Sequence, residues 1–237
     1  MDMDNLNLQP PVAQAGILRI NLHHELTDRL REMIVEGRLE AGVKVPEKDL
    51  CLQMGVSRTP LRESLKVLAA EGMVALTPNR GASVSPLTRQ EVVDVFPILG
   101  ALEGLAGSLA GPRIEEAGLE VLRTLQNQMA KNYEKGDLSA YFKCNQAVHQ
   151  TILKAAGNEA LLSTHNSLSG RMRRYRYAAN LSRKRWREAI EEHQSILEAL
   201  VARNANKVSF LLQEHFRHKL VAALRQIDRE TPAPPPA

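Results

Sequence analysis

The sequence of 237 residues contains few cysteines, few aromatic residues and no long apolar run. Its two cysteines, Cys51 and Cys144, have no CxxC spacing, which excludes a disulfide framework and a cysteine-built zinc knuckle. No stretch approaches the roughly 18 consecutive apolar residues of a membrane span, and the N-terminal MDMDNLNLQP lacks the pattern of a signal peptide. We therefore expect a cytoplasmic protein with no membrane partner.

The composition is that of an ordinary globular chain. Hydrophobic residues make up 43% and charged residues 24%, while aromatics are only 4%, as in helices built on Leu and Ala. The length predicts one or two domains, because a domain usually has roughly 100 to 200 residues. Collagen-like and disordered classes are excluded.

The net charge of +4 suggests a nucleic-acid partner, but its distribution does not locate one. Residues 1–86 carry ten Lys and Arg against eleven Asp and Glu, whereas residues 87–237 carry 21 against 16. Part of the excess lies in the run from Arg171 to Arg187, which has eight basic residues and no acidic one. This run is either a solvated helix end or a wall that attracts an anion.

The N-terminal part predicts three helices and a hairpin. After an arm expected to be flexible (1–15), apolar residues recur at helical spacing from Leu22 to Glu36, and Gly37 can close that helix. EKDLCLQM and the segment from Ser57 to Ala70 are two further helices, separated by Gly55. MVALT, PNRG and ASVS indicate strand, turn and strand. Residues 16–85 therefore predict a winged helix-turn-helix domain that binds DNA.

The rest of the chain predicts helices alone. Pro86 marks a linker (86–88), and Thr88 with Glu91 forms a capping box that begins a longer helical series. We expect helices near 89–110, 113–135, 138–156, 159–179, 183–203 and 206–227, the first of them kinked at Pro97. The fold class is thus mostly α, with an antiparallel six-helix bundle over 89–228 and a disordered tail over 229–237.

A basic stripe marks the third helix. Arg58, Arg62 and Lys66 are spaced four apart and share one face, beside the apolar stripe of Leu61, Leu65 and Leu68. In a helix-turn-helix, such a helix enters the major groove, where Arg can form a bidentate bond with guanine. Further candidate contacts to phosphates or the minor groove are Lys48, Ser57, Thr59 and Arg80 with its neighbour Gly81.

The string EKDLCLQMGVSRTPLRESLKVLAAEGMVALTPNRGASV closely resembles the winged helix of the GntR family of bacterial transcription regulators. The GVSRTPLRESL core and the P-x-RG ending carry the resemblance. It implies DNA contacts at Lys48, Arg58, Arg62 and Gly81. Lysine stands at position 48 where relatives commonly have arginine, so this contact is expected to be a phosphate bond.

Three histidines in the second part have a suggestive spacing. Asn145 precedes His149 by one helical turn, so their side chains share a face. His215 follows His193 by 22 residues across the Asn204 turn, so the two imidazoles can face each other in an antiparallel pair. Taken singly, each histidine is more often a hydrogen-bonded residue than a metal ligand.

Residues 89–227 look like the FCD ligand-binding domain of the FadR subfamily, and the six expected helices resemble its VanR-type group. The matching strings are EVVDVFPILGALEGLAGSLA, CNQAVHQTILKAAGN, REAIEEHQSILEALVARN and LLQEHFRHKL. The resemblance implies a divalent metal, with Zn or Ni suited to imidazole ligands, held by Asn145, His149, His193 and His215. Open positions on that ion suit a carboxylate or hydroxy-acid effector. Because Asn145 is neutral where many relatives have Asp, we expect stronger attraction of the anion and weaker binding of the metal.

Relatives commonly carry an arginine that binds acidic effectors at the position of Leu99. Either the effector differs from that of these relatives, or Arg171, Arg173 or Arg174 takes the role of the missing arginine. The remaining histidines are expected at the surface: His23, His24, His165 and His218.

These features predict a homodimeric regulator, in which two heads read a palindromic double-stranded operator and a metabolite relieves repression. Four apolar residues of the first long helix of the second part are candidates for the dimer interface: Ile98, Leu102, Leu105 and Leu109. We expect about half of them to lie in the core instead. The alternative is a metal-dependent hydrolase or hydratase that uses the three histidines, with Glu192 as the nearest candidate base in the sequence. A nucleoid-type architectural protein without sequence preference is a third possibility.

Overall fold

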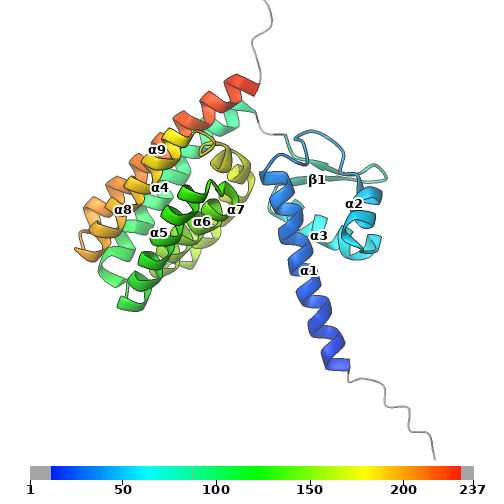
Figure 1. The fold of residues 1–237 in the computed structure, drawn as a ribbon, viewed down its shortest axis with the longest axis horizontal. Coiled ribbons are helices and arrows are strands. Elements are labelled where there is room, and N and C mark those ends of the chain that lie inside the picture. Colours follow the sequence, from blue (N-terminus) through cyan, green and yellow to red (C-terminus); the bar gives the residue numbers. More distant parts are fainter. Residues whose placement is uncertain (1–11, 87, 231–237) are drawn as a thin grey trace, which may run out of the picture.

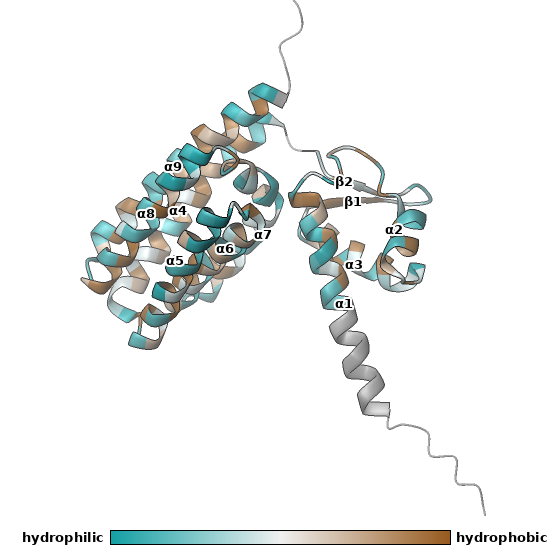
Figure 2. Ribbon diagram, viewed as in Figure 1, coloured by the Kyte–Doolittle hydropathy of each residue, from teal (hydrophilic) through white to brown (hydrophobic). Residues whose placement is uncertain are grey.

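The computed structural model describes residues 12–86 and 88–230 and shows two lobes joined by a short connection near Pro86 (Figure 1). Apolar residues form the core of each lobe, and Figure 2 shows apolar and polar residues alternating along the helices. The first lobe contains both strands and three helices, and the second lobe contains the remaining helices of the described chain.

The first lobe is a helix-turn-helix followed by a wing. Its elements are α1 (Val12–Val35), α2 (Glu47–Met54), α3 (Arg58–Ala70), β1 (Val74–Thr77) and β2 (Gly81–Val84). Gly55 ends α2 with a positive φ of 66°, a conformation that costs glycine little and lets α3 turn away. The strands pair antiparallel, from Val74 opposite Val84 to Thr77 opposite Gly81. The expected winged helix-turn-helix is confirmed.

Leucine spacing gives α3 its buried face. Leu61, Leu65 and Leu68 are at most 1% exposed and pack with Leu26 and Leu30 of α1. Burying such a side chain stabilises the fold by about 1.5–3 kcal/mol, so this stripe fixes which face of α3 remains in solvent. The basic stripe lies on that solvent face.

The second lobe is a bundle of six helices among the described residues. They are α4 (Arg89–Arg113), α5 (Glu116–Lys135), α6 (Leu138–Ala155), α7 (Glu159–Ala178), α8 (Arg183–Val201) and α9 (Ala205–Glu230). Thr88 and Glu91 form the expected capping box at the start of α4. Asp137 and Asn158 cap α6 and α7 by accepting from backbone N–H groups, which sets the short connections between helices.

Three expected boundaries differ from the structure. α1 begins at Val12, inside the segment expected to be a flexible arm, and residues 1–11 of that arm lie outside the described residues. α9 extends to Glu230, two residues into the expected tail, and residues 231–237 of that tail also lie outside the described residues. α4 continues through Pro112 to Arg113, because close packing holds this end: a Cβ at Gly111 would lie 3.1 Å from the Cα atom of Ala205 on α9.

α4 is the one described helix that is long and apolar enough to cross a membrane, judged by length and composition alone. In the fold it packs against α6, α7 and α9, and Val92, Phe96 and Leu99 are fully buried there. The buried apolar residues of α4 thus belong to the core of the bundle, whereas Ile98 and Leu105 remain exposed.

The two lobes contact each other mainly through α7 and the start of α6. Phe142 of α6 is buried in the apolar cluster of the first lobe, with its ring centroid 5.2 Å from that of Tyr177. On α7, a Cβ at Gly170 would lie only 2.9 Å from the carbonyl oxygen of Glu71, the residue that ends α3. The lobes therefore approach without an intervening side chain at this point.

Candidate nucleic-acid interface and candidate metal centre

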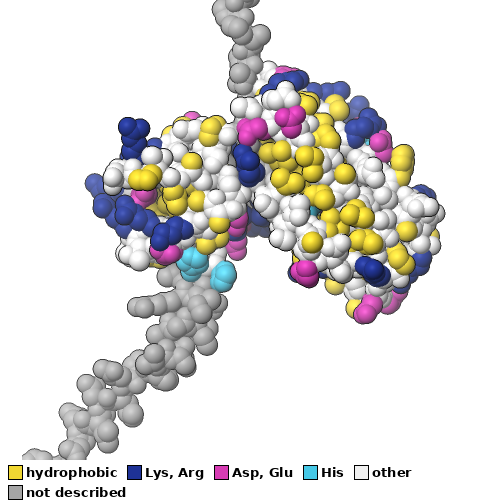
Figure 3. Space-filling model, turned by 180° about the vertical axis from the view of Figure 1, so that it is seen from behind, with side chains coloured by type: hydrophobic (Ala, Val, Ile, Leu, Met, Phe, Trp, Pro, Cys, Tyr) yellow, Lys and Arg dark blue, Asp and Glu magenta, His cyan; other side chains and the backbone are white. Residues whose placement is uncertain are grey.

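Several basic residues of the first lobe line one open groove, together with two acidic ones, Glu47 and Asp49. Its walls come from α2, the start of α3 and the turn of the wing, and the sequence-predicted contacts among its lining residues are Lys48, Arg58, Arg62, Arg80 and Gly81. Lys and Arg side chains gather on the outer side of this lobe (Figure 3). The structure thus brings together residues that are up to 33 positions apart in the sequence, between Lys48 and Gly81.

The charges in the groove are unequally paired. Arg62 donates through Nε to Glu47 Oε2 at 2.9 Å. Lys66, one turn further along α3 and outside the lining of the groove, bonds Glu63 at 2.7 Å. Among the described residues, no carboxylate forms an ion pair with Arg58, Lys48 or Arg80, and all three are exposed. These three cations are available to a phosphate or a base edge without first breaking a bond.

The N-terminus of α3 faces solvent with two free hydroxyl groups nearby. Ser57 occupies the N-cap position, but its side chain forms no capping hydrogen bond, and Ser57 and Thr59 are both exposed. The unpaired N–H groups at a helix N-terminus attract anions. Phosphate contacts are therefore available at this end of α3.

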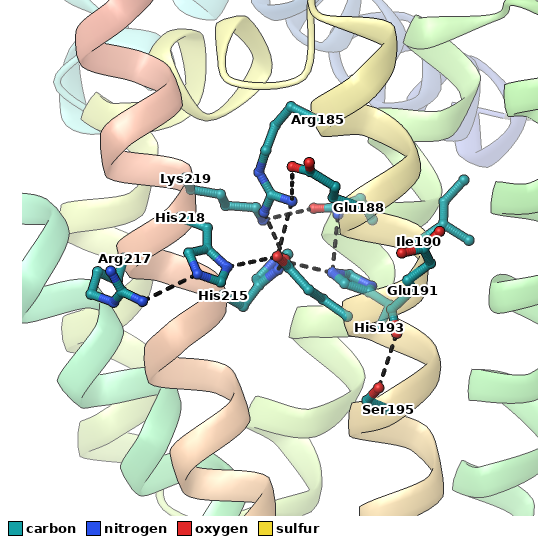
Figure 4. A network of polar contacts seen from close by, with 12 residues as sticks. Arg185, Glu188, Ile190, Glu191, His193, Ser195, His215, Arg217, His218 and Lys219 are labelled. Atoms are coloured by element: carbon teal, nitrogen blue, oxygen red, sulfur yellow. Dashed lines mark hydrogen bonds and ion pairs between the residues drawn. The ribbon is translucent and has the colours of Figure 1, made fainter.

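In the second lobe, three histidines from three helices converge in the interior. His149 of α6, His193 of α8 and His215 of α9 are at most 2% exposed, and one nitrogen of each lies within 4.8 Å of the others. Nε2 of His193 is 3.1 Å from Nε2 of His215 and 3.2 Å from Nδ2 of Asn145. Figure 4 shows His193 and His215 pointing toward one another from α8 and α9. The four expected ligands are thus brought together.

The arrangement of hydrogen-bond donors and acceptors at these contacts favours a bound metal ion. Nδ1 of His215 donates to Glu192, so Nε2 of His215 carries a lone pair. If Nε2 of His193 carries a proton, two donors face each other in the contact with Nδ2 of Asn145. If Nε2 of His193 carries no proton, two lone pairs face each other in the contact with His215. One of the two contacts is mismatched in either tautomer. A metal ion removes the mismatch because it accepts the lone pairs of all three imidazoles. The residues present therefore fit a divalent metal.

Two carboxylates orient the imidazoles from outside. Glu103 of α4, fully buried, lies 2.9 Å from His149 Nδ1 and 2.8 Å from His165 Nε2. Glu192 lies 2.5 Å from His215 Nδ1 and 2.7 Å from His218 Nδ1, and it also binds Arg185. Such partners fix the tautomer of metal-binding histidines and direct Nε2 inward. Glu192 orients His215 instead of standing free as a general base.

Burial keeps these imidazoles neutral, as metal binding requires. Desolvation lowers the pKa of His149 to about 4 against the opposing effect of Glu103, and it lowers the pKa of His193 and His215 well below the usual value. Burial alone would raise the pKa of Glu103, but His149 and His165 hold it well below its usual range. Glu103 is therefore an anion in the interior.

The expected surface positions of the other histidines are partly wrong. His165 is fully buried, because the carboxylate of Glu103 draws its ring into the bundle. The side chain of His218 is 42% exposed and contacts Glu192, so it forms the rim of the cluster. In the first lobe, His24 is exposed and His23 is half-buried.

The arginines expected to replace the one missing at Leu99 lie elsewhere. Arg171 bonds Glu91, Arg173 lines a hollow with Asp28 and Glu32 of the first lobe, and Arg174 lies near Gly37. All three face the first lobe or the start of α4, because the histidine cluster lies against a different face of α7. Leu99 itself is buried against the apolar residues around Phe216.

Three buried basic side chains of the cluster were not expected from the sequence, namely Arg176, Arg185 and Lys219. Arg176, in the same basic run, is 1% exposed; its Nη1 contacts Ser169, whereas Nε and Nη2 have no hydrogen-bond partner among the described residues. Desolvation lowers the pKa of Arg176 to about 10. Lys219 is fully buried one turn after His215, and that spacing of four is the signal that indicates its position.

Comparisons with known proteins agree with this arrangement. Residues 22–84 match the model of bacterial regulatory proteins of the gntR family, and residues 94–218 match that of the FCD domain. The probable D-xylose utilization operon transcriptional repressor of Paenarthrobacter nicotinovorans is 30% identical over 84% of this chain and 87% of its own. The Nta operon transcriptional regulator of Aminobacter aminovorans is 32% identical over 78% of this chain and 88% of its own.

Among solved structures, E. coli McbR/YncC has the same fold, with a TM-score of 0.77 at 23% identity over 87% of this chain and 98% of its own. A winged helix with a basic groove, joined to a helical domain with an internal polar cluster, defines a one-component transcription regulator. The chain belongs to the gntR family of bacterial regulators that carry an FCD domain. Since its relatives are transcriptional regulators, it is not an enzyme, and the hydrolase alternative is wrong.

Proposed function

We propose that this protein is a homodimeric repressor that binds a palindromic operator and releases it when a small carboxylate enters a metal-centred pocket of the helical domain. Residues 16–85 form the DNA-binding domain and residues 89–228 the effector and dimerisation domain, with 86–88 as the linker. The observation that carries the proposal is the pair of sites in one chain: an exposed basic groove in one lobe and a buried ligand cluster in the other.

The DNA contacts follow from the groove. Arg58 and Arg62 read base edges in the major groove, with Arg62 steadied by Glu47, and Arg80 beside Gly81 enters the minor groove. The remaining contacts are made to phosphates by Lys48, Ser57, Thr59 and Lys66. Two symmetric heads then require a two-fold related pair of half-sites.

Asn145, His149, His193 and His215 hold the metal, and Zn or Ni suits this set of neutral nitrogen and amide ligands. When bound, the ion supplies a positive charge and open positions that attract a carboxylate.

The carboxylate character of the effector is supported by unpaired positive charge. Arg176 has two unpaired donors in the interior, and a guanidinium binds carboxylates in bidentate fashion. A groove of about 800 Å³ opens beside the cluster, and its lining includes Arg185, Glu192, His215 and His218. This groove is the entrance by which an effector reaches the cluster from solvent.

The dimer seam is supported by apolar residues that the chain leaves in solvent. Ile98 and Leu105 of α4 are 49% and 46% exposed, whereas Leu102 and Leu109 pack against the core of the bundle. Figure 3 shows hydrophobic side chains gathered on one face of the helical lobe. Exposed apolar patches of this kind mark protein interfaces.

The sign of regulation is supported by the names of two relatives, the D-xylose utilization operon repressor and the E. coli repressor RspR. An effector changes operator affinity only by binding the two arrangements of the heads unequally. As a regulator of chromosomal DNA, the protein acts in the bacterial cytoplasm.

The test is fluorescence anisotropy with an operator fragment selected by the protein from random DNA. We expect saturable binding that weakens steeply with salt and that shuffled DNA does not compete away. A panel of small carboxylates and hydroxy acids is then titrated into the complex, and one of them should release the DNA from the wild type but not from His193→Ala. Equal competition by shuffled DNA would instead indicate an architectural protein. Release of the DNA that does not depend on His193 would contradict the metal-centred pocket.

A further inference from the structure

Lys219 places an amine among the predicted metal ligands. Its Nζ atom lies 3.2 Å from His149 Nε2 and 3.3 Å from Asn145 Oδ1, and 5.2 Å from the ring centroid of Phe216. The residue is fully buried on α9, so solvent does not share in these contacts. Figure 4 shows its side chain directed toward the cluster from the same helix as His215 and His218.

The partners of this lysine are unusual. A buried lysine is normally paired with a carboxylate, because an unpaired charge in the interior is costly. Among the described residues no carboxylate forms an ion pair with Lys219; Glu103 and Glu192 contact histidines and Arg185 instead. Its hydrogen bonds go to the two ligand atoms that α6 supplies.

The spacing matches that of a ligand in a coordination sphere. Zn–N bonds are about 2.0–2.1 Å long, which puts the ligand atoms of a tetrahedral site roughly 3.4 Å apart. Nζ keeps nearly this distance from His149 and Asn145, as His193 does from His215 at 3.1 Å. The amine thus stands at the edge of the space that an ion would fill, hydrogen-bonded to two of the atoms that would hold the ion.

From this geometry we propose that Lys219 competes with the divalent ion for Asn145 and His149, so that the protein holds the ion weakly and exchangeably. An amine has at least two N–H donors in either protonation state, enough to occupy the lone pairs of both atoms. While the lysine occupies these two atoms, only His193 and His215 remain as ligands for the ion. The inference depends on the metal centre of the proposed function and adds a residue that sets its affinity.

The experiment is a zinc titration of the full-length protein against a fluorescent chelator, without DNA. Lys219→Met removes the N–H donors at similar side-chain length, and Lys219→Leu removes them with a shorter apolar side chain. Both variants are expected to bind zinc at least tenfold more tightly than the wild type. Lys207→Met, an exposed position on the same helix, is the matched control and should leave the dissociation constant unchanged.

Adding His193→Ala to Lys219→Met should abolish the gain, which shows that the zinc lies in the cluster. Unchanged zinc affinity in both lysine variants would overturn the inference, and weaker binding would overturn it by making the amine a ligand. A thermal melt identifies a variant that fails to fold, in which case the other variant decides. If neither the wild type nor any folded variant binds zinc through His193, both the metal centre and the inference about Lys219 are wrong. If the wild type binds zinc through His193 and the lysine variants show no gain, only the inference about Lys219 is wrong.

Discussion

The two candidate sites of this protein use charge in opposite surroundings. In the DNA-binding lobe, Arg58 and Lys66 stand in solvent on one face of one helix. In the helical lobe, Glu103, His149 and Lys219 are excluded from solvent and come from three different helices. Removing a side chain from the first site should alter binding alone, whereas removing one from the second should alter the stability of the fold as well.

The contrast follows from the cost of burying charge. An exposed ion pair contributes about 0–1 kcal/mol, so the DNA face can be rearranged for recognition with little effect on the fold. A buried charge that loses its partner costs about 3–5 kcal/mol, so each member of the internal cluster depends on the others. The cluster is therefore part of the core of the bundle as well as a ligand site.

The largest expected effect tests this dependence. Glu103→Ala should lower the free energy of unfolding by about 3–5 kcal/mol, because it leaves His149, His165 and nearby Arg176 without their buried anion. Urea denaturation followed by circular dichroism measures the change. Glu116→Ala, an exposed carboxylate paired with Arg123 in the same lobe, is the control and should change stability by less than about 1 kcal/mol. Equal losses in the two variants would contradict the contrast.

Acid should act on the buried cluster next. The pKa of His149 is about 4 in the fold against about 6.5 in the unfolded chain, so the unfolded state binds more protons between these values. Stability is then fully present above pH 6.5 and falls as the pH is lowered toward 4, by about 2 kcal/mol at pH 5 from His149 alone. Urea unfolding in EDTA at pH 7.5 and pH 5 measures the loss. His149→Gln should make the dependence shallower, with the rest coming from His193 and His215, while exposed His24→Gln should leave it intact.

On the exposed side, Arg58→Ala should weaken operator binding by about 1–3 kcal/mol and leave the unfolding curve unchanged. Anisotropy titrations against the selected operator and against single-base variants measure both affinity and base preference. Arg38→Ala, an exposed arginine paired with Glu36 outside the groove, is the control. A large loss of stability in Arg58→Ala would show that the two sites are not as different as the exposure of their side chains indicates.

The smallest effect is expected at Lys66, which already bonds Glu63. Lys66→Ala should weaken binding to operator and to unrelated DNA by the same factor, because a phosphate contact carries no sequence information. The slope of log affinity against log salt should fall by about 1. A change in base preference would assign Lys66 to base readout instead.

The sequence predicts the DNA face well because its information is local. Spacing of four along one helix places Arg58 and Arg62 together, and the apolar stripe on the opposite side fixes their exposure. Two glycines mark the turns that position the recognition helix and the wing. They are Gly55 and Gly81, and both have a positive φ in the structure. Whether each residue contacts DNA stays a prediction.

The internal cluster is only partly readable in this way. Asn145, His149, His193 and His215 follow from spacing and family resemblance, and the structure brings them together. Arg176 and His165 do not follow, because their burial depends on Glu103, an acidic residue on a fourth helix with no local pattern around it. Among the eight basic residues in one run, spacing alone does not show that Arg176 and Arg185 are the buried ones.

The close approach of Gly170 to Glu71 puts α7 of the helical lobe in direct contact with the residue that ends α3. Gly170 of α7 contacts the backbone of Glu71. Six residues further along α7, a rise of about 9 Å, Arg176 is part of the buried cluster. With no side chain at position 170, the backbone of α7 meets the end of α3 directly. The candidate effector contact at Arg176 and the contact with α3 therefore lie on one helix, so a single element of the fold joins the two sites.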